Sequence, residues 1–145
     1  MCEYCGCRAI PLIGRFSAEH YEILNLSGDL KRAIAQGGDV PAAAKALDVL
    51  LFPHTEAEEV GLFVEMRSDE AYTKTIDSLC AEHSDLDDQL TRIANGAHGE
   101  YDAFEYALRR HIDHEDNGLF PAAAVSLDGD QWERIVKATP EAELS

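Results

Sequence analysis

The sequence predicts an all-α protein: an up-down four-helix bundle, with a short C-terminal fifth helix and a short N-terminal arm. Apolar residues recur every three or four positions along most of the chain, which is the spacing of one helical face. No stretch alternates apolar and polar residues as a half-buried strand does. The second half of the chain repeats the pattern of the first, so each half predicts one helical hairpin.

The first two predicted helices have clear boundaries. The first begins near Pro11, since proline suits a first helical turn, and the glycine pair at 37–38 ends it. The second opens at Asp39 or Val40. Pro53 lies within it and removes a backbone hydrogen bond, so we expect the helix either to bend there or to divide into two pieces.

The next two predicted helices form the second hairpin. Ser68 is a suitable N-cap for the third helix, which ends at the Asn-Gly pair 95–96. The fourth helix runs from about Gly99 until Gly118 and Pro121 break it. A short fifth helix is expected to cover one end of the bundle, starting at Asp128 or Asp130 and including Trp132, Ile135 and Val136.

One domain is predicted, because 145 residues with 46% hydrophobic and 28% charged residues suffice for a folded core. Residues 1–10 form the arm, residues 11–138 the bundle with its covering helix, and residues 139–145 a tail. The net charge of -16 argues against nucleic acid and anionic membrane as partners, since both repel an acidic surface. The sequence shows no secretion signal and no membrane-spanning apolar run, which predicts a cytoplasmic protein.

Three cysteines lie close together at the N-terminus, where Cys2, Cys5 and Cys7 form a Cys-x-x-Cys-x-Cys pattern. Three thiolates are one fewer than a structural zinc or iron–sulfur site usually takes. Cys80 supplies a fourth only if the arm folds back to the third helix. The sequence leaves open whether the arm simply packs on the bundle or is redox-active or metal-binding.

Two stretches share the pattern His-x-x-x-Glu-x-x-Gly-Leu-Phe, one at residues 54–63 and the other at residues 111–120. A histidine and a glutamate four positions apart lie one turn apart on the same helical face. Each motif is preceded by an Ala-Glu-His tripeptide, at residues 18–20 and 81–83. Each predicted helix therefore carries one histidine on its inward stripe, and two carry a glutamate as well: His20, His54, Glu58, His83, His111 and Glu115.

These six polar residues predict a metal site at the centre of the bundle. Burying carboxylates without partners costs several kcal/mol each, so something must compensate them, and a metal ion does so. Imidazole and carboxylate ligands without thiolate suit iron or manganese, with zinc possible. Six protein ligands are too many for one tetrahedral zinc. Two metals that share two bridging carboxylates fit better and leave open positions for small molecules.

This set of residues resembles the hemerythrin-like family, in the form called the HHE cation-binding domain, over residues 11–122. The Cys-rich opening is similar to that of small actinobacterial members of the family. The resemblance implies that the four histidines are terminal ligands and that Glu58 and Glu115 bridge two non-haem irons, which also share an oxo or hydroxo bridge. The ferritin-like family is a weaker match, because its helices carry Glu-x-x-His instead.

The chain departs from oxygen-carrying hemerythrins at one position and offers two alternative ligands. Those proteins have a second histidine four residues after the one on the third helix, where this chain has Asp87. They also carry His-x4-Asp on the fourth helix, which Asp116 would satisfy, although the internal repeat favours Glu115. His114 lies one turn from His111 and is a candidate fifth imidazole. Glu59 and Asp87 are expected beside the ligands or in solvent.

The expected function is that of a di-iron protein which binds or reacts with dioxygen, hydrogen peroxide or nitric oxide. Such a protein would act as a sensor, scavenger or weak peroxidase in oxidative or nitrosative stress, and whether it turns over stays open. The alternative is an iron-binding module, as an iron sensor or as a donor for iron–sulfur repair without turnover. A structural bundle with zinc or no metal is the third possibility. The sequence contains no phosphate loop, dinucleotide fingerprint or Ser-His-Asp arrangement.

Overall fold

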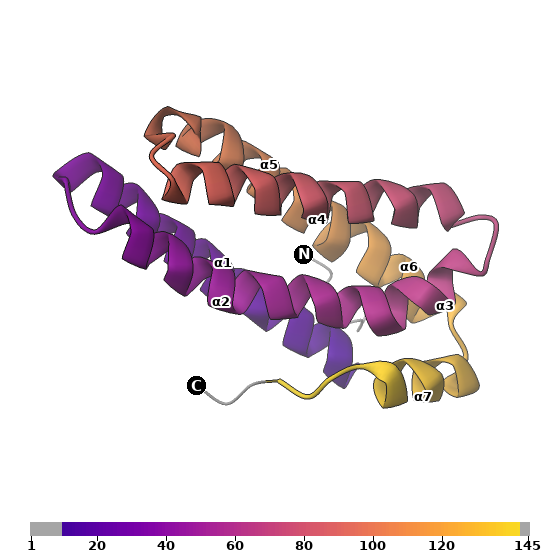
Figure 1. The fold of residues 1–145 in the computed structure, drawn as a ribbon. Helices are drawn as coiled ribbons and strands as arrows, with labels where there is room; N and C mark the ends of the chain where they lie inside the picture. The colour runs from indigo at the N-terminus through magenta and orange to yellow at the C-terminus, as the bar shows by residue number, and fades with distance from the viewer. Residues whose placement is uncertain (1–9, 143–145) are drawn as a thin grey trace.

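A computed structural model describes residues 10–142 of the protein, and every regular element in that range is helical (Figure 1). This confirms the all-α class. The long helices are α1 (Pro11–Gln36), α2 (Val40–Glu58), α4 (Thr73–Ala94) and α5 (Tyr101–His114). The shorter α-helices are α3 (Val64–Arg67), α6 (Phe120–Ser126) and α7 (Gly129–Ala138). Two π-helical segments, η2 (Glu59–Phe63) and η4 (Glu115–Leu119), and one 3₁₀ turn, η3 (His98–Glu100), complete the set.

The four long helices lie side by side and form a bundle (Figure 1). Helix α1 packs against α2, α2 against α4, α4 against α5, and α5 against α1. Helix α7 lies outside this group and packs against η2. No helix within residues 10–142 combines the length and the apolar character that crossing a bilayer requires.

The buried apolar residues form two clusters, and the predicted site lies between them. On α1, Phe16 belongs to one cluster and Ile23 to the other, with His20 between them in the chain. On α4, Leu79 and Leu86 flank His83 in the same way. The polar centre is therefore enclosed at both ends by apolar packing, which keeps it away from water.

The predicted ends of α1 and the predicted start of α2 are confirmed. Pro11 lies in the first turn of α1, and Gly37 ends the helix in the left-handed conformation, with φ of 67°. The Asp39 carboxylate accepts a hydrogen bond from the Ala42 amide at 3.0 Å and so caps α2. Pro53 does not divide α2, which is continuous from Val40 to Glu58.

Ser68 is not the N-cap of the third long helix, and that prediction was wrong. Ser68 ends α3, where its hydroxyl donates to the Glu65 carbonyl at 2.6 Å. The Asp69 carboxylate then accepts from the Ala71 amide at 2.9 Å and holds a turn. This local bonding competes with helix formation, so α4 begins only at Thr73.

Gly118 and Pro121 do not end the fourth helix, which corrects a second prediction. Helix α5 passes directly into the π-helical segment η4 and then into α6. Gly118 lies inside η4, and Pro121 occupies the first turn of α6, where proline is tolerated. Segment η2 follows α2 in the same way. Single π-helical turns are rare overall but frequent at functional sites. Segment η2 directly follows the candidate ligand Glu58, and η4 begins at the candidate ligand Glu115.

Candidate metal centre

All six predicted site residues meet in the interior of the bundle. His20 comes from α1, His83 from α4 and His111 from α5, while His54 and Glu58 lie one turn apart on α2 and Glu115 opens η4. The exposed fraction of each histidine is 6% or less, and both glutamates are fully buried at 0%. Buried charged groups at this density require compensation, as the sequence argument anticipated.

The six side chains form two groups that share both glutamates. One group is His20, His54, Glu58 and Glu115, and the other is Glu58, His83, His111 and Glu115. Within each group, one nitrogen or oxygen atom from every residue lies within 4.8 Å of the others. Imidazole and carboxylate donors gathered in this way are able to bind metal. The structure thus brings all six residues together, and their role as ligands stays a prediction.

Every histidine of the cluster is oriented by a carboxylate from another element. In each case the ring Nδ1 lies 2.7–2.9 Å from a carboxylate oxygen: His54 with Glu19, His83 with Glu59, His111 with Glu82, and His20 with Asp116. The opposite ring nitrogens face inward, since Nε2 of His83 lies 3.1 Å from Nε2 of His111. A carboxylate on one ring nitrogen fixes the tautomer and leaves the other free to bind metal.

These orienting contacts follow the internal repeat. The glutamate of each Ala-Glu-His tripeptide contacts the histidine of the next long helix, as Glu19 does with His54. The residue after each buried glutamate reaches a histidine of the opposite half, as Glu59 does with His83. From the sequence, Glu59 was expected either beside the ligands or in solvent. Glu19 and Glu82 were not predicted as site residues, although their recurrence in the Ala-Glu-His tripeptide indicated a shared role.

The two alternative ligands lie beside the cluster. Asp116 accepts from Ser17 Oγ at 3.1 Å as well as contacting His20, so it acts as an orienting group. His114 is 37% exposed at its side chain, and its Nδ1 lies 2.9 Å from Glu82. Among the described residues, neither belongs to either group of candidate ligands. Asp87 is exposed and belongs to neither group. The arm with Cys2, Cys5 and Cys7 lies outside the described residues.

We expect Glu19→Gln to weaken metal binding by roughly 10–100-fold, because outer carboxylates that orient a ligating histidine have effects of this size. The amide cannot fix the His54 tautomer as a carboxylate does. Glu22→Gln, at an exposed position one turn along α1, is the matched control. Competition with a chromophoric chelator measures the affinity, and equal affinities for the two variants would contradict the role given to Glu19.

Aromatic rings hold the histidines from the other side. Phe63 stacks on His83 with ring centroids 5.4 Å apart, and Phe120 stacks on His20 at 5.9 Å. Both phenylalanines end a copy of the repeat motif. The motif therefore supplies a histidine, a buried glutamate and the ring that packs on a histidine of the opposite half. The sequence contained this phenylalanine twice, but only the structure shows what it contacts.

The two buried glutamates differ in their surroundings. Burial, followed by the charge of Glu115, raises the pKa of Glu58 above its ordinary value. Burial also opposes the charge of Glu115, but the charge of His111 and hydrogen bonds with His111, His20 and His83 hold its pKa well below the usual range. Both oxygens of Glu58 are buried without a hydrogen-bond partner among residues 10–142.

A metal ion fits these atoms. A fully buried carboxylate is costly. Glu58 Oε1 lies 3.2 Å from His83 Nε2, but neither Glu58 oxygen accepts a hydrogen bond within the described chain, and His54 Nε2 beside it has no hydrogen-bond partner there either. His54 Nε2 and Glu58 Oε1 are 3.4 Å apart. A cation bound to His54 Nε2 and Glu58 would give all of these atoms a partner at once, whereas a single proton shared between them would leave a Glu58 oxygen without one. The donor chemistry therefore agrees with a cation-binding site.

Metal uptake should release about three protons per chain at neutral pH, because histidine must lose its proton to bind metal. Burial opposes the charged form of each ring, yet hydrogen bonds to the carboxylates raise the pKa of His20 to about 10 and that of His83 to about 12. The pKa of His111 is raised to about 9, chiefly by Glu115. These rings therefore hold protons before metal arrives, and apparent affinity should rise steeply with pH across the neutral range. A pH indicator in weak buffer measures the release, and no acidification would contradict the prediction.

A helical bundle with a buried cluster of histidines and shared glutamates defines a class of cation-binding helical domains. Comparison with protein families places the chain within that class: the model of the hemerythrin HHE cation binding domain matches residues 12–123. The chain therefore belongs to the hemerythrin HHE family, as its sequence motifs predicted. Neither a curated protein nor a solved structure matched the chain.

Proposed function

We propose that this protein is a non-haem di-iron protein that binds or reacts with a small oxidant: dioxygen, hydrogen peroxide or nitric oxide. The observation that carries the proposal is the pair of four-residue groups that share Glu58 and Glu115. Two neighbouring cations are the simplest occupants of two groups with common carboxylates. Its role would be that of a sensor, scavenger or weak peroxidase.

Iron is favoured by the chemistry of the donor set. Each group offers two imidazoles and two carboxylates, and no cysteine of residues 10–142 joins them. Such mixed nitrogen and oxygen donors suit iron or manganese, while soft thiolates would have pointed to other metals. Family membership, established over residues 12–123, agrees with cation binding. Four protein donors leave open positions on a six-coordinate ion, which a small molecule can take.

The chain's own residues prepare the site. When bound, iron would supply exchangeable positions and one-electron redox chemistry toward the oxidant. The orienting carboxylates hold each imidazole in one tautomer, with Nε2 directed inward. Phe63 and Phe120 pack on histidine rings and exclude water from them. A dry, rigid site strengthens electrostatic interactions within it and limits access to small molecules.

Metal analysis combined with absorption spectroscopy tests the proposal. The purified protein should contain about two irons per chain, and its near-ultraviolet bands should change when dioxygen, peroxide or nitric oxide is added. Iron without a spectral response to any of the three would overturn the oxidant-binding role and leave an iron-binding module. Zinc, or no metal after growth in iron-rich medium, would overturn the di-iron assignment itself.

A further inference from the structure

The internal repeat creates two equivalent grooves on the outside of the bundle. The first, the α1/α2 groove, runs past Leu12, Arg15, Glu19 and Glu56, which line two adjoining pockets, and past Gly61, against which α7 packs. The second, the α4/α5 groove, is lined by Thr75, Ser78, Glu82, Asp113 and Gly118. The two sets of residues correspond one to one in the internal repeat, in the order given. For example, Glu19 corresponds to Glu82, and Gly61 corresponds to Gly118. The matching contacts of Glu19 with His54 and of Glu82 with His111 show that the correspondence holds in space.

The C-terminal part of the chain lies along the α1/α2 groove, where Pro140 lines two remaining pockets of about 340 Å³ each. A side chain at Gly61 would overlap Thr139 and would lie 3.0 Å from the Ile135 carbonyl oxygen, so α7 rests directly on this glycine. The Arg15 guanidinium donates to the Pro140 carbonyl at 2.7 Å, which holds the residues after α7 along the groove. Ile135 is buried there with 1% of its surface exposed. The groove thus accepts a helix that presents an aliphatic side chain and, four residues later, a small one.

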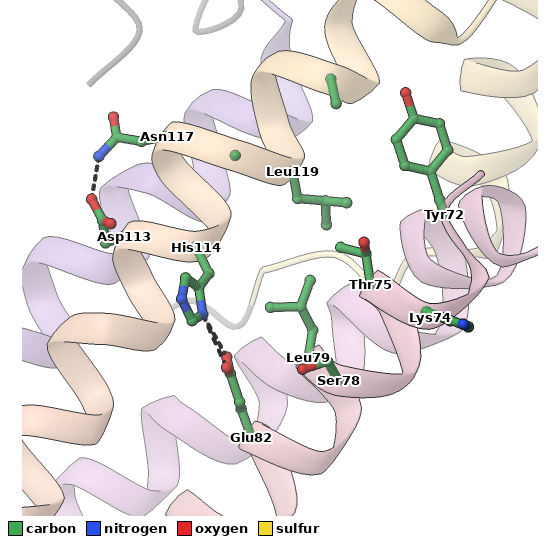
Figure 2. Close-up of a pocket in the computed structure, with 12 residues that line it drawn as sticks. Tyr72, Lys74, Thr75, Ser78, Leu79, Glu82, Asp113, His114, Asn117 and Leu119 are labelled. Carbon is green, nitrogen blue, oxygen red and sulfur yellow. Dashed lines mark hydrogen bonds and ion pairs between the residues drawn. The ribbon is translucent and has the colours of Figure 1, made fainter.

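The α4/α5 groove is open in the part of the chain that the structure describes. It forms a pocket of about 640 Å³ (Figure 2). Leu79 and Leu119 lie on its apolar floor, and Figure 2 shows Tyr72 at one end and the bonded pair of His114 and Glu82 at the other. A Cβ added at Gly118 would meet no described atom within 4 Å. Nothing within residues 10–142 occupies the position that corresponds to α7.

We propose that the α4/α5 groove binds an amphipathic helix of a partner protein, in the position that α7 takes on the α1/α2 groove. The partner helix would place an aliphatic side chain over Leu79 and Leu119, and a small residue four positions later against Gly118. Its residues beside the groove would be basic, because the chain carries a net charge of -16 and the groove is lined by Glu82 and Asp113 against one lysine, Lys74. That same charge disfavours a second copy of this chain as the occupant.

Such a partner would contact Glu82, a carboxylate that orients a histidine in only one half of the candidate metal site. Glu82, which lines the groove, also lies 2.7 Å from His111 Nδ1, whereas the equivalent Glu19 is held by Arg15 at 3.2 Å beneath the C-terminal residues. The two halves of the site are therefore equivalent in their donors but different in what covers them. Docking at this groove does not depend on which metal is bound, so it can be tested separately from the proposed function.

A labelled peptide of residues 128–141 carrying Asp130→Lys and Glu133→Lys is a suitable probe. It keeps the Ile135 and Thr139 spacing and the Asp128–Gln131 capping box, and the two substituted positions are exposed on α7. Because the attached α7 already covers Gly61 in the α1/α2 groove, the free peptide should bind one site on the full-length protein. We expect the unsubstituted peptide to bind about threefold more weakly at low salt, and the difference to shrink at high salt.

Two variants locate the binding. Gly118→Trp should weaken binding by at least about tenfold, because it fills the space that the helix requires. Gly99→Trp, at another position where a side chain meets nothing within 4 Å, should bind as the unmodified protein does. Amide NMR signals of Ser78 and Gly118 should shift on binding. The proposal is overturned if no binding occurs at millimolar peptide, if Gly118→Trp binds equally well, or if the shifts appear at Gly61, which would indicate displacement of α7.

Discussion

Replacing Glu58 with glutamine should remove most of the metal from the purified protein and weaken metal binding by more than about 100-fold. Outer-shell partners alone are worth roughly 10–100-fold, and Glu58 belongs to both groups of candidate ligands. The amide keeps the shape of the side chain but cannot supply two anionic oxygens. Metal analysis of protein prepared in iron-supplemented medium, followed by chelator competition, measures the effect.

Two controls separate loss of ligand from loss of fold. Glu56→Gln, at an exposed position on the same helix, should bind metal normally. The Tm of metal-free Glu58→Gln should stay close to that of the metal-free parent, because relief of a fully buried charge is offset by loss of its ion pair with His83 Nε2 at 3.2 Å. A variant that folds and retains full metal content would refute the shared-carboxylate site.

Gly61→Ala should lower the free energy of unfolding by about 1–3 kcal/mol, the usual cost of forcing extra atoms into a packed contact. The added methyl group would overlap Thr139 and press on the backbone carbonyl of Ile135. The chain can relieve the contact only by shifting α7 away from η2. Thermal unfolding measures the loss. Trp132, the only tryptophan and a residue of α7, reports the movement through its fluorescence.

Gly118→Ala is the matched control, because Gly118 occupies the same place in the second copy of the motif. An added Cβ there meets nothing within 4 Å, and alanine favours a helix over glycine by up to about 1 kcal/mol. Its stability should therefore stay the same or rise, with unchanged Trp132 fluorescence. Equal losses at Gly61 and Gly118 would mean that α7 does not rest on the first glycine as described.

Much of the fold and of the candidate site was predictable from local patterns. Helical periodicity and the glycine pair at 37–38 located α1, and Asp39 located the start of α2, because these signals act through neighbouring residues. The six candidate ligands were identifiable because they recur at fixed spacing in two halves of one chain. Local patterns were misleading at Ser68, where the turn at Asp69 delays the next helix, and at Pro121, which lies in the first turn of α6 and does not end the helical path.

The sequence by itself determined the all-helical class, the family and the set of polar residues that point inward. Only the tertiary structure decided which carboxylate orients which histidine, since Glu59 and Asp116 act on histidines of the opposite half. It also decided that two copies of one motif have different surroundings, with α7 on Gly61 and an open pocket beside Gly118. The physical reason is that helical spacing is set by bonds within a few residues, whereas these contacts depend on how separate helices pack.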